Sequence, residues 1–445
     1  MYATVPAHIR ETHLKDWRTM FTLFGSCRTL AAAAVTMLLF VAPRTVAQSP
    51  DSEDRPVSEL ETRLINVHGS RKLLDGGSSI DWSQTTNRML IGKRGVNQYF
   101  NVYYVSPVRP RPRVVTLNRD PDNPRLHNGN PSWMPGDKYF LFTGQNRGSS
   151  SYRMSLPDSG LNCNIWLADR EGETFWKLTN LPTRYTDPRG VVSPDFSPDR
   201  SKVVWSGNTG DYPRESVWGR HAVYLADFEM EGGKPKLTNQ QTLQPGPRPD
   251  FYRSHGFSPD GNKLLFSSNL QERQRVAGMD LYTLDMRTQE LTNLTRSADS
   301  WDQFGSYSPD GNKIVWMSSR GQKISYLPMA NQSWKRHLKT ELWIMDADGK
   351  NARQLTRFNE KGHPDYIGTR AYITESEWGP DGSSIAICLN YETLNFNLES
   401  RIVVLKLGKG PRPENAELMT PPVRTVRTRR ENLPDQSWRF RRLNR

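Results

Sequence analysis

The sequence predicts an all-β protein, a six-bladed β-propeller built from four-stranded antiparallel blades. Two observations predict it. An aromatic residue followed by a Ser-Pro-Asp-Gly turn, or a near copy, and then by a short apolar run occurs six times along the chain. A second hairpin-like stretch follows each of these copies. Repetition at a long period indicates a repeat architecture, and two hairpins supply the four strands of one propeller blade.

The first hairpin of each repeat is clearest in FSPDGNKLLF at 257–266 and YSPDGNKIVW at 307–316. Pro presets φ for a turn, Asp and Asn tolerate turn geometry, and Gly supplies a positive φ. The apolar and β-branched flanks are typical of strands. The uneven spacing of the six copies indicates constant blades joined by loops of different lengths. The leading aromatic residues are Trp82, Trp133, Phe196, Phe257, Tyr307 and Trp378.

The second hairpin is clearest in NIWLADREGETFWKLT at 164–179 and ELWIMDADGKNARQLT at 341–356. An all-β sandwich with coincidental turn chemistry is the alternative, but six ordered pairs of hairpins favour the propeller. The other four copies lie at 101–117, 222–238, 280–295 and 401–420.

Taken together, FSPDGNKLLF and ELWIMDADGKNARQLT resemble the TolB-like propeller repeat, and similar repeats occur in prolyl-oligopeptidase-type peptidases. The resemblance covers roughly 78–420 and is specific for fold rather than function. It implies a periplasmic protein that contacts envelope partners, such as a peptidoglycan-associated lipoprotein. TolB proteins carry an α/β domain before the propeller, where we expect only a short leader here. A peptidase would need a hydrolase domain with a Gly-x-Ser-x-Gly elbow, and the sequence contains no such elbow.

The N-terminus predicts export. An apolar stretch at 29–42 follows Arg28, and Thr45-Val46-Ala47 offers a small-residue cleavage site, so 1–47 reads as a signal peptide. An uncleaved N-terminal anchor is the alternative. We expect a periplasmic or secreted protein with a polar leader at 48–77, a propeller at 78–420 and an Arg-rich tail at 421–445. Within the leader, residues 63–67 could form a strand that closes the ring.

The formal charge of +13 is concentrated at the two ends of the chain. Residues 1–47 carry +3 and the tail carries +6, which leaves only +4 for residues 48–420. A nearly balanced propeller argues against nucleic-acid binding. The tail either contacts an anionic surface or is a solvated terminus. Cys163 and Cys388 fall in separate repeats, so we expect two buried free thiols. We also expect a monomer.

The working face is predicted from loop lengths. Turns within each hairpin are short, whereas connections between hairpins and between blades are long, and in an up-and-down blade these long connections share one face. Their aromatic and Arg residues are types enriched at binding sites. We expect this face to bind an envelope or extracellular protein, or an acidic oligosaccharide, without a cofactor. The expected ligand-binding residues are Arg189, Arg253, His255, Trp301, Tyr185, Tyr252 and Tyr372.

Two alternatives stay open. Carboxylates and a histidine that we expect to enter the inner strands could bind a divalent cation or could cap backbone groups; these are Asp195, Glu375, Glu377 and His255. We predict no metal. A propeller-type polysaccharide lyase acting on uronate-containing glycans is the second alternative, because such enzymes use His, Tyr and Arg for proton abstraction. The candidate residues are His127, Tyr185, Arg189, His255, His363 and Tyr372.

Overall fold

The described part of the chain is all-β. A computed structural model describes residues 62–116, 125–149, 159–212, 218–247, 251–297, 299–322, 337–368, 370–393 and 395–418. The expected signal peptide and Arg-rich tail lie outside these residues. The helical elements described are three 3-10 turns: η2 (Thr62–Leu64), η3 (Arg147–Ser149) and η4 (Val276–Gly278).

Six four-stranded antiparallel sheets confirm the predicted blades. Within each blade the strands run from the centre outward in chain order, except for one strand of the sixth blade. The first three blades are β2 (Ser79–Trp82), β3 (Met89–Arg94), β4 (Phe100–Val105) and β5 (Arg113–Val114); β6 (Asn128–Trp133), β7 (Tyr139–Gln145), β8 (Cys163–Asp169) and β9 (Phe175–Lys177); and β10 (Gly190–Phe196), β11 (Lys202–Asn208), β12 (His221–Glu231) and β13 (Lys234–Leu243).

The last three blades follow the same plan. They are β14 (Tyr252–Phe257), β15 (Lys263–Ser268), β16 (Asp280–Asp285) and β17 (Leu291–Asn293); β18 (Asp302–Tyr307), β19 (Lys313–Ser318), β20 (Glu341–Asp346) and β21 (Arg353–Gln354); and β22 (Ala371–Trp378), β23 (Ser384–Glu392), β24 (Leu398–Lys409) and β1 (Ile65–Asp75).

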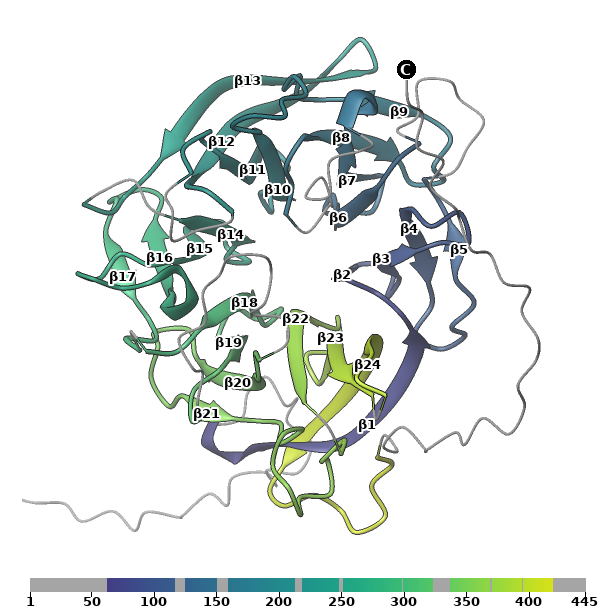
Figure 1. Ribbon diagram of the computed structural model, residues 1–445, viewed down its shortest axis with the longest axis vertical. Coiled ribbons are helices and arrows are strands. Elements are labelled where there is room, and N and C mark those ends of the chain that lie inside the picture. Colours follow the sequence, from purple (N-terminus) through teal and green to yellow (C-terminus); the bar gives the residue numbers. More distant parts are fainter. Residues whose placement is uncertain are drawn as a thin grey trace, which may run out of the picture. The chain divides into compact units, whose positions relative to one another are not determined.

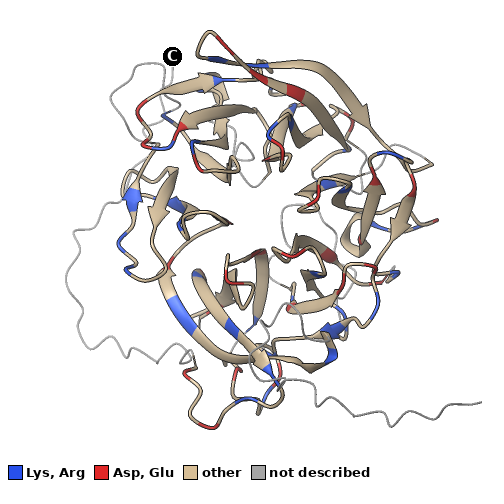
Figure 2. Cartoon of the chain, turned by 180° about the vertical axis from the view of Figure 1, so that it is seen from behind, with Lys and Arg blue, Asp and Glu red and all other residues tan. Residues whose placement is uncertain are grey.

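The inner strands form a closed ring around a central channel (Figure 1). Each inner strand contacts the next in the order β2, β6, β10, β14, β18, β22 and back to β2. Figure 2 shows basic and acidic residues spread over all the blades rather than gathered on one of them.

The N-terminal strand closes this ring. β1 pairs antiparallel with β24 from Ile65 opposite Lys409 to Asp75 opposite Arg401. The second hairpin that we predicted at 401–420 is therefore wrong in part, because it supplies only one strand, β24. Pro411 and Pro413 follow β24, and neither can donate a backbone hydrogen bond to a ladder. The outer place in the sixth blade is occupied by β1 instead.

The Ser-Pro-Asp-Gly phrases form tight turns held by their own side chains. In the fourth blade, Ser258 Oγ donates to Asp260 Oδ1 at 2.5 Å, and the Asn262 N–H donates to the same carboxylate at 3.1 Å. Gly261 has a φ of 72°, in the left-handed region that glycine tolerates best. In the fifth blade, Ser308 Oγ donates to Asp310 Oδ1 in the same way, also at 2.5 Å. The Ser-Pro-Asp-Gly sequence therefore stabilises the tight turn between two strands.

Apolar side chains between adjacent blades form the core. The leading aromatic residues pack there; Trp133, for example, stacks on Tyr104 of the first blade with 5.4 Å between ring centroids. Trp378 is 1% exposed, and its Nε1 donates to the Ser306 carbonyl of the fifth blade at 3.2 Å. Cys163 and Cys388 are buried free thiols, as predicted.

Candidate functional site

Two cavities lie along the central channel. The loop-face pocket, about 140 Å³, is lined by residues at the long-connection ends of the strands, including Trp218, Phe251 and Trp301. The channel cavity, about 420 Å³, is lined by inner-strand residues and by the tight-turn prolines Pro198, Pro259 and Pro309. Glu375 lines both cavities.

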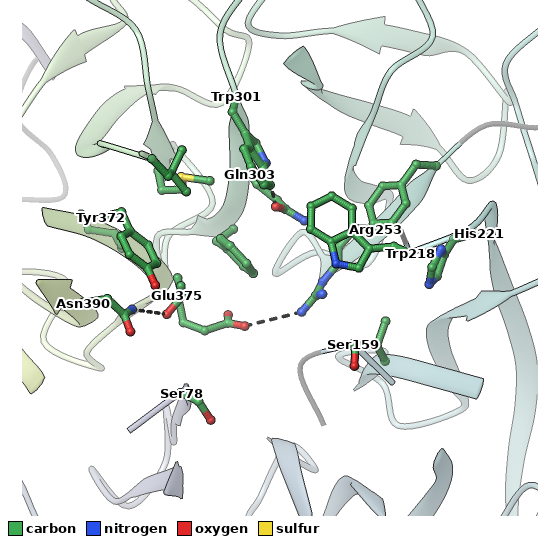
Figure 3. A pocket seen from close by; sticks show the side chains of 17 residues that line it. Ser78, Ser159, Trp218, His221, Arg253, Trp301, Gln303, Tyr372, Glu375 and Asn390 are labelled. Carbon is green, nitrogen blue, oxygen red and sulfur yellow. Dashed lines mark hydrogen bonds and ion pairs between the residues drawn. The ribbon is translucent and has the colours of Figure 1, made fainter. Parts of the chain in front are cut away.

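Aromatic rings form one wall of the loop-face pocket (Figure 3). Trp218 lies edge-on to Trp301 with 5.7 Å between ring centroids, and it also contacts Phe251 at 5.8 Å. Phe251 in turn packs against His221, with 4.7 Å between the two ring centroids. Burial lowers the pKa of His221 to about 3, with Arg253 as a smaller contribution, so this imidazole is neutral near neutral pH.

An ion pair also lines this pocket. Arg253 Nη2 of β14 is 3.8 Å from Glu375 Oε1 of β22, so the pair joins the fourth and sixth blades (Figure 3). Their side chains are 9% and 19% exposed. The Arg253 guanidinium lies over the Phe304 ring of the intervening fifth blade, 5.2 Å from its centroid. Glu375 and the Phe304 ring together hold the Arg253 guanidinium among apolar side chains.

A β-bulge places Phe304 under Arg253. The register of β18 against β19 shifts between Gln303 and Ser306, and Phe304 has a φ of 55°. A positive φ is rare for an aromatic residue, but the inner strands of the second, third, fourth and sixth blades have the same kind of register shift, so the bulge is a feature of the repeat. The bulge directs the strand at the point where its side chains line the loop-face pocket.

Polar side chains of the pocket have fixed orientations. Trp301 Nε1 donates to Gln303 Oε1 at 2.9 Å, which turns the amide nitrogen of Gln303 toward the Arg253 side (Figure 3). Asn390 Nδ2 donates to Thr374 Oγ1 at 3.0 Å beside Glu375. The pocket therefore combines one cation, one carboxylate and oriented amide groups.

Three of the expected ligand-binding residues meet in this pocket. Arg253, Trp301 and Tyr372 all line it. His255 lies two residues beyond Arg253 and lines the channel cavity, where its ring Nε2 is 2.6 Å from Ser267 Oγ. Tyr252 is fully buried among the apolar side chains between the third and fourth blades.

The other two expected residues lie elsewhere on the molecule. Tyr185 is 59% exposed, and its hydroxyl donates to the Gly148 carbonyl between loops of the second blade. Arg189 packs beside Gly210 in the third blade. Neither is among the described residues that line the two cavities.

Besides Glu375, three carboxylic acids line the channel cavity. Asp81, Asp195 and Glu377 come from the first, third and sixth blades. Each is the last residue but one of its inner strand, so the expectation that these residues enter the strands is wrong. The strands begin further upstream, and the acids lie toward the tight-turn end of the channel.

Burial dominates the ionisation of these acids. It raises the pKa of Asp81 to about 7, and the nearby carboxylates of Asp195 and Asp137 add to the rise. Burial raises the pKa of Asp195 to about 6, although Ser132 Oγ donates to it at 2.6 Å. The pKa of Glu377 is well above its usual value, through burial first and then repulsion by Asp81 and Glu375. In the part of the chain that the structure describes, no cluster of His, Cys, Asp and Glu could hold a metal ion.

Sequence reasoning missed several residues of the loop-face pocket. Gln303 and Phe304 lie within β18, and counting back from Tyr307 would have placed them on the inner strand. Their direction depends on the bulge, for which the Trp-Asp-Gln-Phe sequence gives no signal. Glu375 was considered only as a metal ligand or a capping group, and its contact with Arg253 depends on the ring geometry.

Comparisons with known proteins agree with the propeller repeat. No protein-family model matches the chain. Over 138 residues, 31% of its length, the chain is 29% identical to the Tol-Pal system protein TolB of Anaeromyxobacter dehalogenans, strain 2CP-C. The match to TolB of Anaeromyxobacter sp. strain K has the same identity and extent. The chain is a six-bladed β-propeller with a region of similarity to TolB proteins. It spans about a quarter of the length of the curated relatives it matches.

Solved structures similar to this TolB-like propeller include a TolB-type protein from Agrobacterium tumefaciens, with a TM-score of 0.45, 18% identity, and coverage of 66% of this chain and 87% of that one. TolB from Acinetobacter baumannii has a TM-score of 0.38, 16% identity, and coverage of 77% and 64%. An oligogalacturonate lyase in complex with manganese has a TM-score of 0.43, 13% identity, and coverage of 75% and 78%. Within the described ranges, the chain has no helix with the length and apolar character needed to cross a bilayer.

Proposed function

We propose that this TolB-like propeller is an exported binding module that holds a segment of an envelope protein in its loop-face pocket. The observation that carries the proposal is the Arg253–Glu375 pair, which lines the same pocket as Trp218 and Trp301 at one end of the channel. Aromatic and Arg side chains in a partly enclosed pocket are typical of residues that dominate binding energy.

A protein partner suits the pocket better than an acidic oligosaccharide. Arg253 and Glu375 give the pocket one positive and one negative charge, and His221 is neutral. A strongly anionic chain would bring its charges next to the Glu375 carboxylate, and like charges at that distance repel. The similarity to Tol-Pal system proteins and the apolar stretch at 29–42 support an envelope location.

The residues considered for a lyase do not converge. His127 packs against Tyr99 and Phe100 of the first blade, and His363 lies 3.6 Å from Asp365. His255 lies in the channel cavity, whereas Tyr372 lines the loop-face pocket. General acid and base groups must lie within hydrogen-bond reach of one substrate, so we do not propose the lyase.

Capture of partners from a solubilised envelope fraction tests the proposed function. The wild-type protein is compared with a Trp301→Ala variant and with a Trp176→Ala control, in which the lost indole belongs to β9 of the second blade. We expect a defined protein to be recovered by the wild type and the control but not by the pocket variant. Equal recovery by all three would contradict the choice of pocket. Recovery of only acidic polysaccharide would contradict the choice of a protein partner.

A further inference from the structure

We infer that the β4–β5 loop of the first blade, residues 106–112, docks on an anionic lipid bilayer through its arginines and Val108. The inference goes beyond the proposed function, because this loop lies at the opposite end of the strands from the loop-face pocket. Three features of the loop carry it: a local excess of positive charge, stiffness, and an exposed apolar side chain beside the charges.

The first blade has a local excess of positive charge. Residues 82–116 contain six Lys and Arg and no Asp or Glu. Four of the six are arginines at the end of the strands where the tight turns lie. Anionic lipid surfaces attract Lys and Arg side chains that come within a Debye length. These four residues are Arg88 before β3, Arg109 and Arg111 in the β4–β5 loop, and Arg113 at the start of β5.

The two arginines within the loop present their charge to solvent. Arg109 and Arg111 are exposed, and neither forms an ion pair with another residue that the structure describes. Arg113 differs, because its Nη1 lies 3.3 Å from Glu171 Oε2 of the second blade. That pair is itself exposed, and exposed pairs are weak. The loop therefore carries positive charge that the described part of the chain does not neutralise.

Prolines and hydrogen bonds stiffen the loop. Three of the seven residues at 106–112 are prolines, and each proline fixes its own φ. At the base of the loop, Arg71 Nη2 of β1 donates to the Pro107 carbonyl at 2.8 Å. Within the loop, the Arg111 N–H donates to the Arg109 carbonyl at 2.7 Å. A loop that is ordered before binding loses little conformational entropy when it meets a surface.

An apolar side chain accompanies the charges. Val108 is 78% exposed and directly precedes Arg109. The interface of a bilayer accommodates cationic and apolar side chains together, whereas an acidic protein surface matches only the cations. The loop lines neither of the two cavities described above, so it offers an outward surface rather than a pocket for a small anion. These features favour a lipid surface over an acidic protein.

The place of the loop in the blade sets the orientation of the docked protein. β4 runs from the long-connection end of the first blade to the tight-turn end, so the β4–β5 loop lies with the tight turns. The loop-face pocket lies at the other end of the strands. A propeller that docks through this loop presents the pocket away from the bilayer.

Sedimentation with lipid vesicles tests the inference on the full chain. One set of vesicles contains phosphatidylcholine alone, and the other contains phosphatidylcholine and phosphatidylglycerol in equal parts. We expect the protein to bind only the mixed vesicles, and the bound fraction to fall as sodium chloride is added, because salt screens the attraction. An absence of binding to the mixed vesicles would overturn the inference, and so would equal binding to both sets.

Charge variants locate the binding. Arg109→Gln combined with Arg111→Gln removes two charges, and we expect about ten-fold or more weaker binding to the mixed vesicles. Lys234→Gln combined with Arg287→Gln is the matched control. It removes two exposed charges at the corresponding connections of the third and fourth blades and should bind as the wild type does. Both variants keep the Arg-rich tail, so equal affinities would place the binding elsewhere and overturn the inference. Near-ultraviolet circular dichroism checks that each variant is folded.

A third variant and a soluble probe separate a lipid surface from an acidic protein. Val108→Ser keeps every charge, and we expect a few-fold weaker binding to the mixed vesicles because an apolar contact is lost. Unchanged binding by this variant would contradict the part assigned to Val108. Poly-L-glutamate is the soluble acidic probe. If it bound with the same dependence on Arg109 and Arg111 while the vesicles did not, the loop would be a site for an acidic protein and the inference would be wrong.

Discussion

Arg412 and Asp365 form a two-bond ion pair, with 2.8 Å between Nη1 and Oδ1 and 2.7 Å between Nη2 and Oδ2. Arg412 Nε also donates to the Val67 carbonyl of β1 at 2.7 Å. One side chain thus ties the segment after β24 to the closing strand and to the loop that holds Asp365. Asp365 is largely buried, with a side chain that is 5% exposed.

Loss of this pair should destabilise the ring. Arg412→Ala leaves the Asp365 carboxylate buried without its main cation, so we expect the free energy of unfolding to fall by about 2–4 kcal/mol. Urea unfolding measures it. Arg357→Ala breaks an exposed pair with Glu360 in the same loop, and such pairs contribute about 0–1 kcal/mol. Equal losses in the two variants would contradict a structural role for Arg412.

The channel acids should make stability fall as pH rises. Burial raises the pKa of Asp81 to about 7 from its ordinary value near 4, so between pH 4 and 7 the folded protein holds a proton that the unfolded chain has lost. Stability is then lost across that range. Asp81→Asn cannot ionise and can still accept from the Trp133 N–H. We expect it to be more stable than the wild type at pH 8, by on the order of 2 kcal/mol.

A tight-turn acid provides the control of opposite sign. The hydrogen bond from Ser258 lowers the pKa of Asp260, so its contribution is present above the unfolded pKa and is lost as pH falls. Asp260→Asn should therefore be less stable than the wild type above pH 4, with a difference that narrows in acid. If the stability difference from the wild type changed with pH in the same direction for Asp81→Asn and Asp260→Asn, the burial of Asp81 would be contradicted. Urea midpoints from pH 3 to 9 give both curves.

The outer edge of β24 should accept β1 as a separate peptide. A chain that begins at residue 77 leaves this edge with unpaired backbone groups, and exposed edges promote association. We expect that chain to be less stable and prone to aggregate, and we expect a synthetic 62–76 peptide to raise its melting temperature. A peptide with Ile65→Asp and Val67→Asp is the control, because both residues pack in the core. Equal effects of the two peptides would rule out specific strand pairing.

The two buried thiols should report global unfolding. Cys163 and Cys388 are each 0% exposed, so a thiol reagent reaches them only when the structure opens. In a Cys27→Ser protein, we expect modification under native conditions to be slow and to accelerate with urea in step with unfolding. Rapid labelling of either thiol in the absence of denaturant would contradict its burial.

The blades could be predicted because their signals are local. The turn that begins at Ser258 is fixed by residues within five positions of it, and the same chemistry recurs at Ser308. The closing of the sixth blade was harder to predict, because the proline-rich sequence after β24 does not form the fourth strand of that blade. Its missing strand is β1, from the other end of the described chain.

The candidate site was predictable only in part, because it depends on distances across the ring. Arg253, Trp301 and Tyr372 were expected on the loop face from composition, and the structure places them in one pocket. The sequence carries no signal that Phe304 turns under Arg253, because a bulge reverses the alternation of β18. Tyr252 has the same composition signal as Tyr372 but faces the gap between two blades, where it is fully buried.

The pairing of β1 with β24 also sets an order of assembly. Ile65 and Lys409 are opposite each other in the ladder, although more than 300 residues of chain separate them. The first five blades consist of neighbouring hairpins and can form as the chain emerges, whereas the last sheet must wait for β24. Contacts between such distant segments form slowly. A chain crossing a membrane from its N-terminus would therefore carry β1 across early and hold it unpaired until nearly all of the propeller had followed.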